Sequence, residues 1–261
     1  MKEAIESNSH SALVDALSRG SRHLQLDKIL DRIQSDRHQA IKMTLRALEQ
    51  NTWISKVEFS GVLSFGSHYN YQFNVTERAK SAASAALVTR LTSMLRANTS
   101  ITELHLSGSA LTPDEVQELV AALKCNASIK TLHLVDFCVS EVAGEALMDL
   151  LHQVDDDDVA DRRHASAIET LSLQDDGGDR GSGCLPLMAL CAALRCNTTL
   201  TSIDLQIKAF DSDESAELVV AVERNQRIIS CKVSVGAFDE GSDVFAAAID
   251  RILKARFVAL Q

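Results

Sequence analysis

Two histidines stand at equivalent places in two similar segments, and a glutamate precedes the first of them by two positions. The segments read NTSITELHL from residue 98 and NASIKTLHL from residue 126, so His105 and His133 are 28 residues apart. If the segments are neighbouring parallel strands, about 4.8 Å apart, the imidazoles stand side by side with Glu103 close by. Two histidines and a carboxylate could hold a metal or supply a general base.

The same residues also suit a polar pair on a solvated sheet, and we prefer this interpretation. No third strong ligand is evident from the sequence. The G-x-S-x-G and H-E-x-x-H motifs of common hydrolases are absent. We therefore expect no catalytic residue, no metal and no cofactor. The histidine pair could still make partner binding sensitive to pH, because histidine titrates near neutrality.

An internal repeat sets the positions of these residues. The phrase N-x-x-[IL]-x-x-[apolar]-x-[apolar] begins at residues 51, 98, 126, 197 and 225, and a copy at 167, AIETLSL, has lost the asparagine. Asn98 and Asn126 are 28 residues apart, as are Asn197 and Asn225. The longer intervals indicate insertions near 60–82 and 152–166, after which the phase resumes.

Each period predicts a short strand followed by a helix. Alternation such as Leu104-His105-Leu106 sends apolar side chains to one face of a strand. The later stretch TPDEVQELVAALKCN has helical periodicity, with a capping box at Thr112 and Glu115. The closing Asn126 suits the position that ends a helix. Stacked copies bury their apolar sides against one another, which predicts an α/β solenoid with a parallel sheet on its concave side.

The phrase and its period resemble the ribonuclease-inhibitor type of leucine-rich repeat, the superfamily of NOD-like receptors, tropomodulin and Ran GTPase-activating protein. The resemblance covers about residues 45–235 and implies a curved parallel sheet inside and helices outside. One departure concerns the Asn or Cys that the family often places three residues after the second strand leucine. Ser109, Phe137, Lys208 and Gly236 stand there instead. We therefore expect the internal ladder to be absent and the turns to be irregular.

The ends are expected to cap the solenoid. Residues 1–44 are predicted to form an N-terminal helical cap, which includes the segment LQLDKILDRIQ from residue 24. Residues 236–261 are predicted to form a C-terminal capping helix, with a docking helix for a partner as the alternative.

The composition limits the classes of partner. The 261 residues carry a net charge of −10, which disfavours nucleic acid and anionic membranes and favours partners with a basic surface. No apolar run is long enough to span a bilayer, and the first ten residues do not resemble a secretory signal. We expect a cytoplasmic protein, in a cytoskeletal or ciliary assembly for example. Its six cysteines lack a CxxC pair and are predicted to be small buried residues.

The repeats are complete, and the sequence shows no catalytic motif. We therefore predict a non-catalytic scaffold or adaptor that belongs to a hetero-complex. The alternatives are a regulator of a small GTPase or other enzyme, and a metal-dependent enzyme. Aromatic residues of the first insertion, Tyr69, Tyr71 and Phe73, are candidate partner anchors. The other candidates are the polar strand positions of the concave face: Lys56, Glu58, Glu103, His105, Thr131, His133, Thr170, Ser172, Asp204 and Lys232.

Overall fold

A computed structural model describes residues 22–26, 37–60, 77–107, 111–135, 141–151, 166–174, 187–207, 212–235 and 242–259. In these ranges strands and helices alternate along the chain. The strands are β1 (His23–Gln25), β2 (Lys56–Ser60), β3 (Glu103–Ser107), β4 (Thr131–Val135), β5 (Thr170–Gln174), β6 (Ser202–Ile207) and β7 (Ser230–Val235). The helices are α3 (Arg37–Glu49), α4 (Glu77–Ala97), α5 (Pro113–Lys124), α6 (Glu141–Asp149), α7 (Leu187–Cys196), α8 (Ser212–Arg224) and α9 (Ser242–Ala259).

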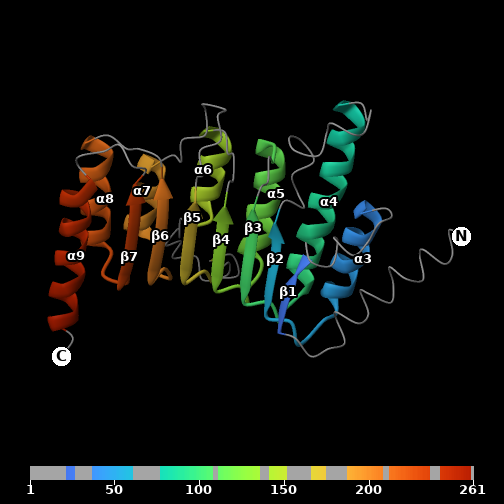
Figure 1. The fold of residues 1–261 in the computed structure, drawn as a ribbon, viewed down its shortest axis with the longest axis horizontal. Helices are drawn as coiled ribbons and strands as arrows, with labels where there is room; N and C mark the ends of the chain where they lie inside the picture. The colour runs from blue at the N-terminus through green and yellow to red at the C-terminus, as the bar shows by residue number, and fades with distance from the viewer. Residues whose placement is uncertain are drawn as a thin grey trace, which may run out of the picture.

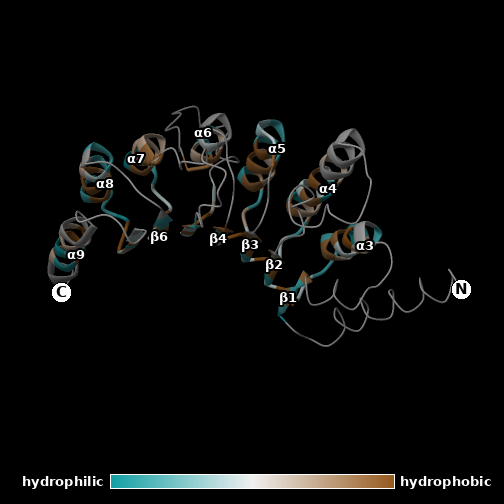
Figure 2. Cartoon of the chain, turned by 45° about the horizontal axis from the view of Figure 1, so that its top comes forward, coloured by the Kyte–Doolittle hydropathy of each residue, from teal (hydrophilic) through white to brown (hydrophobic). Residues whose placement is uncertain are grey.

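The strands form a single parallel sheet in chain order, β1 to β7. Parallel neighbours require a crossover connection, and a helix supplies it for the described repeats. Figure 1 shows the strands side by side in front of the helices. In Figure 2 the array is an arc with the helices on its outer side and the strands on its inner side. The predicted open array of alternating strands and helices is confirmed.

The register of the sheet aligns the repeats. Val57 pairs with Leu104 and Leu104 with Leu132, and Leu132 continues the row to Leu171, Ile203 and Cys231. This row contains the strand positions that the repeat phrase predicts to be neighbours. Leu104 and Leu106 are fully buried under the helices, while the side chain of His105 between them lies on the other face. The period-2 alternation of the sequence therefore separates the core from the solvent side of the sheet.

Helix α5 shows how local sequence sets the ends and the buried side of a helix. The Thr112 hydroxyl accepts a hydrogen bond from the Glu115 amide, and the Glu115 carboxylate accepts one from the Thr112 amide at 2.8 Å. This is the predicted capping box. The helix buries Val116, Leu119, Val120 and Leu123, as its periodicity predicts.

The array begins earlier than the sequence suggests. Residues near 24 were expected to be helical, but His23–Gln25 form strand β1, which pairs with β2. Leu24 and Leu26 are buried, and the Arg22 carbonyl accepts hydrogen bonds from the Ser55 and Lys56 amides. The edge of β2 offers backbone partners that a local helix would leave unused, which explains the strand. Helix α3 also crosses the boundary predicted at residues 44 and 45.

The insertions are described only in part. Helix α4 begins at Glu77, so the end of the first insertion lengthens this helix to 21 residues, against 12 in α5. Tyr69, Tyr71 and Phe73 lie outside the described residues, as do residues 152–165 of the second insertion. Among the described residues, none of the helices combines the length and hydropathy that a bilayer span requires.

The asparagines that begin the repeat phrase form a buried ladder along the turns between helix and strand. We call Asn51, Asn98, Asn126, Asn197 and Asn225 the asparagine ladder; each is at most 6% exposed. The side-chain oxygen of Asn98 accepts hydrogen bonds from the Ser100 and Ile101 amides at 2.9 and 2.8 Å. Its side-chain nitrogen donates to the Leu48 and Asn51 carbonyls of the preceding repeat at 2.6 and 3.0 Å.

Asn126 and Asn225 repeat the two donations to the preceding repeat. Asn126 donates to the Leu95 and Asn98 carbonyls, and Asn225 donates to the carbonyls of Leu194 and Asn197. This ladder differs from the one that the family resemblance concerns, whose positions Ser109, Phe137, Lys208 and Gly236 lie outside the described residues, so its expected absence stays a prediction. The ladder lies at the start of the phrase, where the end of a helix leaves carbonyls without partners. In the copy that has lost the asparagine, the Ser166 hydroxyl accepts a hydrogen bond from Ile168 instead, at 3.3 Å.

An arginine closes the ladder at its C-terminal end. Arg256 of α9 donates to the Val222 carbonyl, and Val222 stands three residues before Asn225, as Leu48 stands before Asn51. Arg256 also donates to the Ile228 carbonyl at 2.6 Å, which corresponds to the bond from the Ser100 hydroxyl to the Ile54 carbonyl. Its guanidinium thus occupies the place of the next asparagine and serine. This contact supports the cap interpretation of the last helix.

Candidate functional site on the open face of the sheet

The side of the sheet that faces away from the helices, here called the open face, carries two main rows of polar side chains. The strand register aligns each row across the repeats. One row contains His23, Lys56, Glu103, Thr131, Thr170, Ser202 and Ser230, and the other contains Gln25, Glu58, His105, His133, Ser172, Asp204 and Lys232. All ten of the predicted concave-face residues lie in these rows, and their role in binding stays a prediction.

The strands β1 to β3 carry a connected network of charges. The Lys56 ammonium lies 2.8 Å from Glu103 Oε1 and 3.2 Å from Glu58 Oε1. Glu58 also binds β1, because His23 Nε2 lies 3.0 Å from Oε1 and Gln25 donates to Oε2 at 2.7 Å. His23 and Gln25 are not among the predicted residues of this face, because residues 1–44 are predicted to form a helical cap. Their strand-like spacing of two residues was the available signal.

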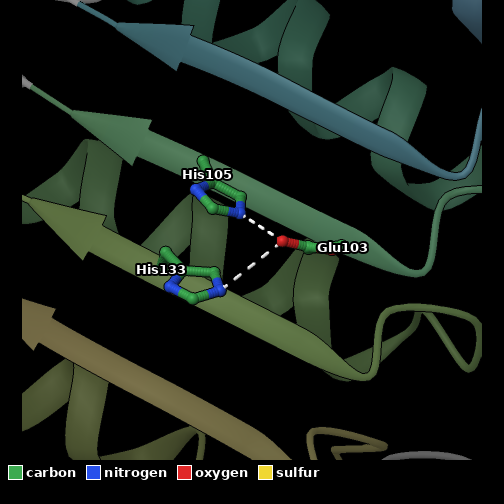
Figure 3. Close-up of side chains that lie close together, drawn as sticks. All are labelled: Glu103, His105 and His133. Atoms are coloured by element: carbon green, nitrogen blue, oxygen red, sulfur yellow. Dashed lines mark hydrogen bonds and ion pairs between the residues drawn. The ribbon is translucent and has the colours of Figure 1, made fainter. Parts of the chain in front are cut away.

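The network continues to two stacked histidines (Figure 3). His105 and His133 pair in register, and their ring centroids are 3.9 Å apart with an interplanar angle of 22°. His105 Nε2 lies 2.5 Å from Glu103 Oε1, and His133 Nε2 lies 3.7 Å from the same oxygen. The prediction that these three residues stand together is confirmed, and the expectation that they hold no metal stays a prediction.

The surroundings of this cluster set its protonation. Burial raises the pKa of Glu103, but hydrogen bonds from Lys56 and His105 outweigh burial and lower the pKa below its ordinary value. Burial lowers the pKa of His133, and the charge of His105 lowers it further. Lys56 has a raised pKa, chiefly because of its hydrogen bond to Glu103. Near neutral pH the cluster therefore combines an ionised carboxylate with a neutral His133.

The strands β5 to β7 present a different surface. Their row positions carry the small hydroxyl residues Thr170, Ser172, Ser202 and Ser230, together with Asp204 and the exposed Lys232. The Ser172 side chain is buried and Thr170, Ser202 and Ser230 are half-buried, so this half is low in relief, whereas the charged half presents groups already bonded to one another. The two halves of the open face thus differ in both charge and relief.

The cysteines correct one further expectation. Cys191 is buried, and burial raises the pKa of its thiol to about 11. Cys231 lies on the core side of β7, and burial raises its pKa to about 12. Cys125 and Cys196 are exposed, however, at the position just before a ladder asparagine. The prediction of buried thiols is therefore wrong for these two, because the C-terminal end of each helix faces solvent there.

Comparisons with known proteins leave the family open. No family description and no curated protein matches the chain. A solved structure titled "Leiomodin-1 Actin-Binding Site 2 (ABS2)" is similar at 15% identity, over 83% of this chain and 92% of that chain, with a TM-score of 0.37. A TM-score this low does not establish a shared fold, so the function has to be inferred from this chain's own residues.

Proposed function

We propose that this chain is a non-catalytic protein-interaction module of the leucine-rich-repeat type, and that it binds a protein partner on the open face. The repeat assignment is supported by the phrase of the sequence, by the in-register parallel strands and by the asparagine ladder, which ties each turn to the previous repeat. A fold of this kind is a scaffold, and its function depends on the surface residues.

The observation that carries the proposal is the open face itself. Within the described ranges every helix lies on the other side of the sheet (Figure 2). The open-face positions of the strands are polar and vary along the array, while the core positions stay apolar. A broad surface with charged, hydroxyl and imidazole groups in aligned rows suits recognition of another protein over many contacts. The protein is expected to act inside a hetero-complex.

The partner should carry a basic surface. The chain has a net charge of −10, which raises the association rate with cations over long range. Several charges of the open face are satisfied within it, as Lys56 is by Glu58 and Glu103. Long-range attraction is therefore expected to supply the association rate, and contacts with the hydroxyl-rich half to supply specificity.

The proposal is tested by blocking the open face while leaving the helices intact. Thr170→Arg places a long side chain in the middle of the sheet, and Gln117→Arg places the same side chain on the exposed side of α5. Both tagged variants and the wild type are used for affinity capture from the native cell type, followed by quantitative mass spectrometry. We expect proteins that wild type and Gln117→Arg retain to be lost from Thr170→Arg. Equal retention by both variants, or capture of no protein, would contradict the proposal.

A further inference from the structure

The strongest unassigned feature of the molecule is the cluster of Glu103, His105 and His133 on the open face. Each residue offers one ligand atom, and the three atoms all lie within 4.8 Å of one another. They come from two adjacent strands, β3 and β4, whose positions the sheet hydrogen bonds fix. The backbone of two paired strands therefore places the three ligand atoms together, and no loop has to become ordered for the site to form.

We propose that Glu103, His105 and His133 bind a divalent transition-metal ion, with Zn²⁺ as the reference ion. Two imidazole nitrogens and one carboxylate oxygen form a donor set that zinc accepts, with at least one position left for water. In a tetrahedral zinc site with bonds of about 2.0–2.1 Å, ligand atoms lie about 3.3 Å apart. The distances of 2.5 and 3.7 Å from Glu103 Oε1 to the two histidine nitrogens lie on either side of that value. Because the rings are stacked at 22°, they have to turn away from parallel before both Nε2 lone pairs point at one ion.

The two histidine rings point the same edge toward the carboxylate. Both contacts to Glu103 Oε1 are made by an Nε2 atom, and the rings are nearly parallel (Figure 3). Without an ion, Glu103 Oε1 contacts His105 and Lys56, whereas His133 Nε2 lies 3.7 Å away, beyond hydrogen-bond distance. An ion between the three atoms gives each of them its own bond, and imidazole suits Zn²⁺, Cu²⁺ and Ni²⁺.

Lys56 is the group that opposes the ion, because its ammonium contacts the same oxygen of Glu103 at 2.8 Å. It has an alternative partner, since Glu58 Oε1 lies 3.2 Å away on the same strand as Lys56. The lysine can therefore remain paired with Glu58 while Glu103 turns to the metal. This competition predicts a moderate affinity, so that the ion can be loaded and removed.

The location of the cluster gives the ion a role that an interior site would not have. The three side chains are 24–31% exposed, so the remaining coordination position faces the solvent side of the sheet. A ligand atom from a bound protein could take that position. The inference goes beyond the proposed function, because the ion would bind with or without a partner.

The test uses the full chain, freed of metal with a chelator and titrated with Zn²⁺ by calorimetry. His105→Gln and His133→Gln each remove one ligand, whereas His23→Gln removes a histidine of the same face that bonds Glu58 instead. We expect each ligand variant to weaken one binding event at least about tenfold, because even second-shell changes cost that much. His23→Gln should bind like the wild type. Circular dichroism checks that all four proteins are folded.

Spectroscopy and stability give independent readouts. Co²⁺ should give visible absorption bands with the wild type and His23→Gln that are lost with His133→Gln. Zn²⁺ should raise the Tm of the wild type but leave that of His105→Gln unchanged, because only an ion bound to the native state stabilises it. Equal Zn²⁺ affinities in the wild type and both ligand variants would overturn the inference, as would the absence of any Zn²⁺ binding to the wild type. Loss of the partner in the Thr170→Arg capture is a separate result, so the two proposals can fail independently.

Discussion

The asparagine ladder and the open face lie on the same repeats but follow opposite rules. The ladder places the same residue in the same hydrogen bonds at Asn98, Asn126 and Asn225. The rows of the open face change along the array, as from Glu58 through His133 to Asp204, although some neighbours such as His105 and His133 are identical. What recurs holds the repeats together, because each turn needs the same carbonyls satisfied. The variable residues of the open face are available for recognition of a partner. Four substitutions test this difference between the asparagine ladder and the open face.

The largest effect is expected from removing one member of the ladder. Asn98→Ala leaves the Ser100 and Ile101 amides without their acceptor. It also removes one donor each from the Leu48 and Asn51 carbonyls, which keep the Asn51 amide and the Ser100 hydroxyl. Since an unsatisfied buried polar group costs about 1–3 kcal/mol, the variant should lose at least about 3 kcal/mol of unfolding free energy. Urea denaturation followed by circular dichroism measures it. A loss below about 1 kcal/mol would show that the ladder is not what joins the repeats.

The next effect concerns the end of the ladder. Arg256→Ala removes the hydrogen bonds to the Val222, Glu223 and Ile228 carbonyls and should cost about 2 kcal/mol. Arg251→Ala on the same helix is the control, because Arg251 is exposed. The same denaturation experiment compares them. Equal stability of the two variants would mean that α9 does not cap the array through this guanidinium.

A smaller effect separates charge from packing on the open face. Lys56→Gln removes the cation beside Glu103, and we expect Zn²⁺ to bind about three- to tenfold more tightly, because a positive charge a few ångströms from the ion is lost. Calorimetry at fixed ionic strength measures the change. Weaker binding would indicate that Lys56 supports the geometry of Glu103 rather than competing with an ion.

The smallest change in unfolding free energy is expected on the part of the open face that lacks a network of ion pairs. Asp204→Asn changes one partly exposed group in the row of His133 and should alter the unfolding free energy by less than about 0.5 kcal/mol. Urea denaturation beside Asn98→Ala gives the direct comparison. A loss above about 1 kcal/mol at Asp204 would break the distinction between a structural ladder and a variable face.

Much of the fold could be predicted because it depends on short-range spacing. The alternation around Leu104 and the helical period of Val116 and Leu119 determine which side is buried, and equal phase aligns the strands. Strand β1 escaped prediction because three residues carry too little periodicity and lack the repeat phrase. The edge of β2, a tertiary feature, selected its conformation.

For the candidate site, the sequence could predict which residues lie next to one another but not how their side chains are oriented. The sequence placed His105 and His133 side by side through the 28-residue period, and the register confirmed that. Side-chain direction is a different matter. Contacts between the strands select the rotamers of these side chains. The rotamers in turn place both Nε2 atoms near one oxygen of Glu103 and allow Lys56 and His23 to extend the network.

By itself the sequence determined the alternation of strands and helices, the row of apolar strand positions and the candidate residues of the open face, since period and phase are local properties of a chain. Tertiary structure alone decided what the asparagines do. Their partners are carbonyls 28 to 50 residues away, which come within reach only when the repeats stack. It likewise decided that Arg256 takes the place of the next asparagine, because no further copy of the repeat phrase follows Asn225 to supply a donor to the Val222 carbonyl.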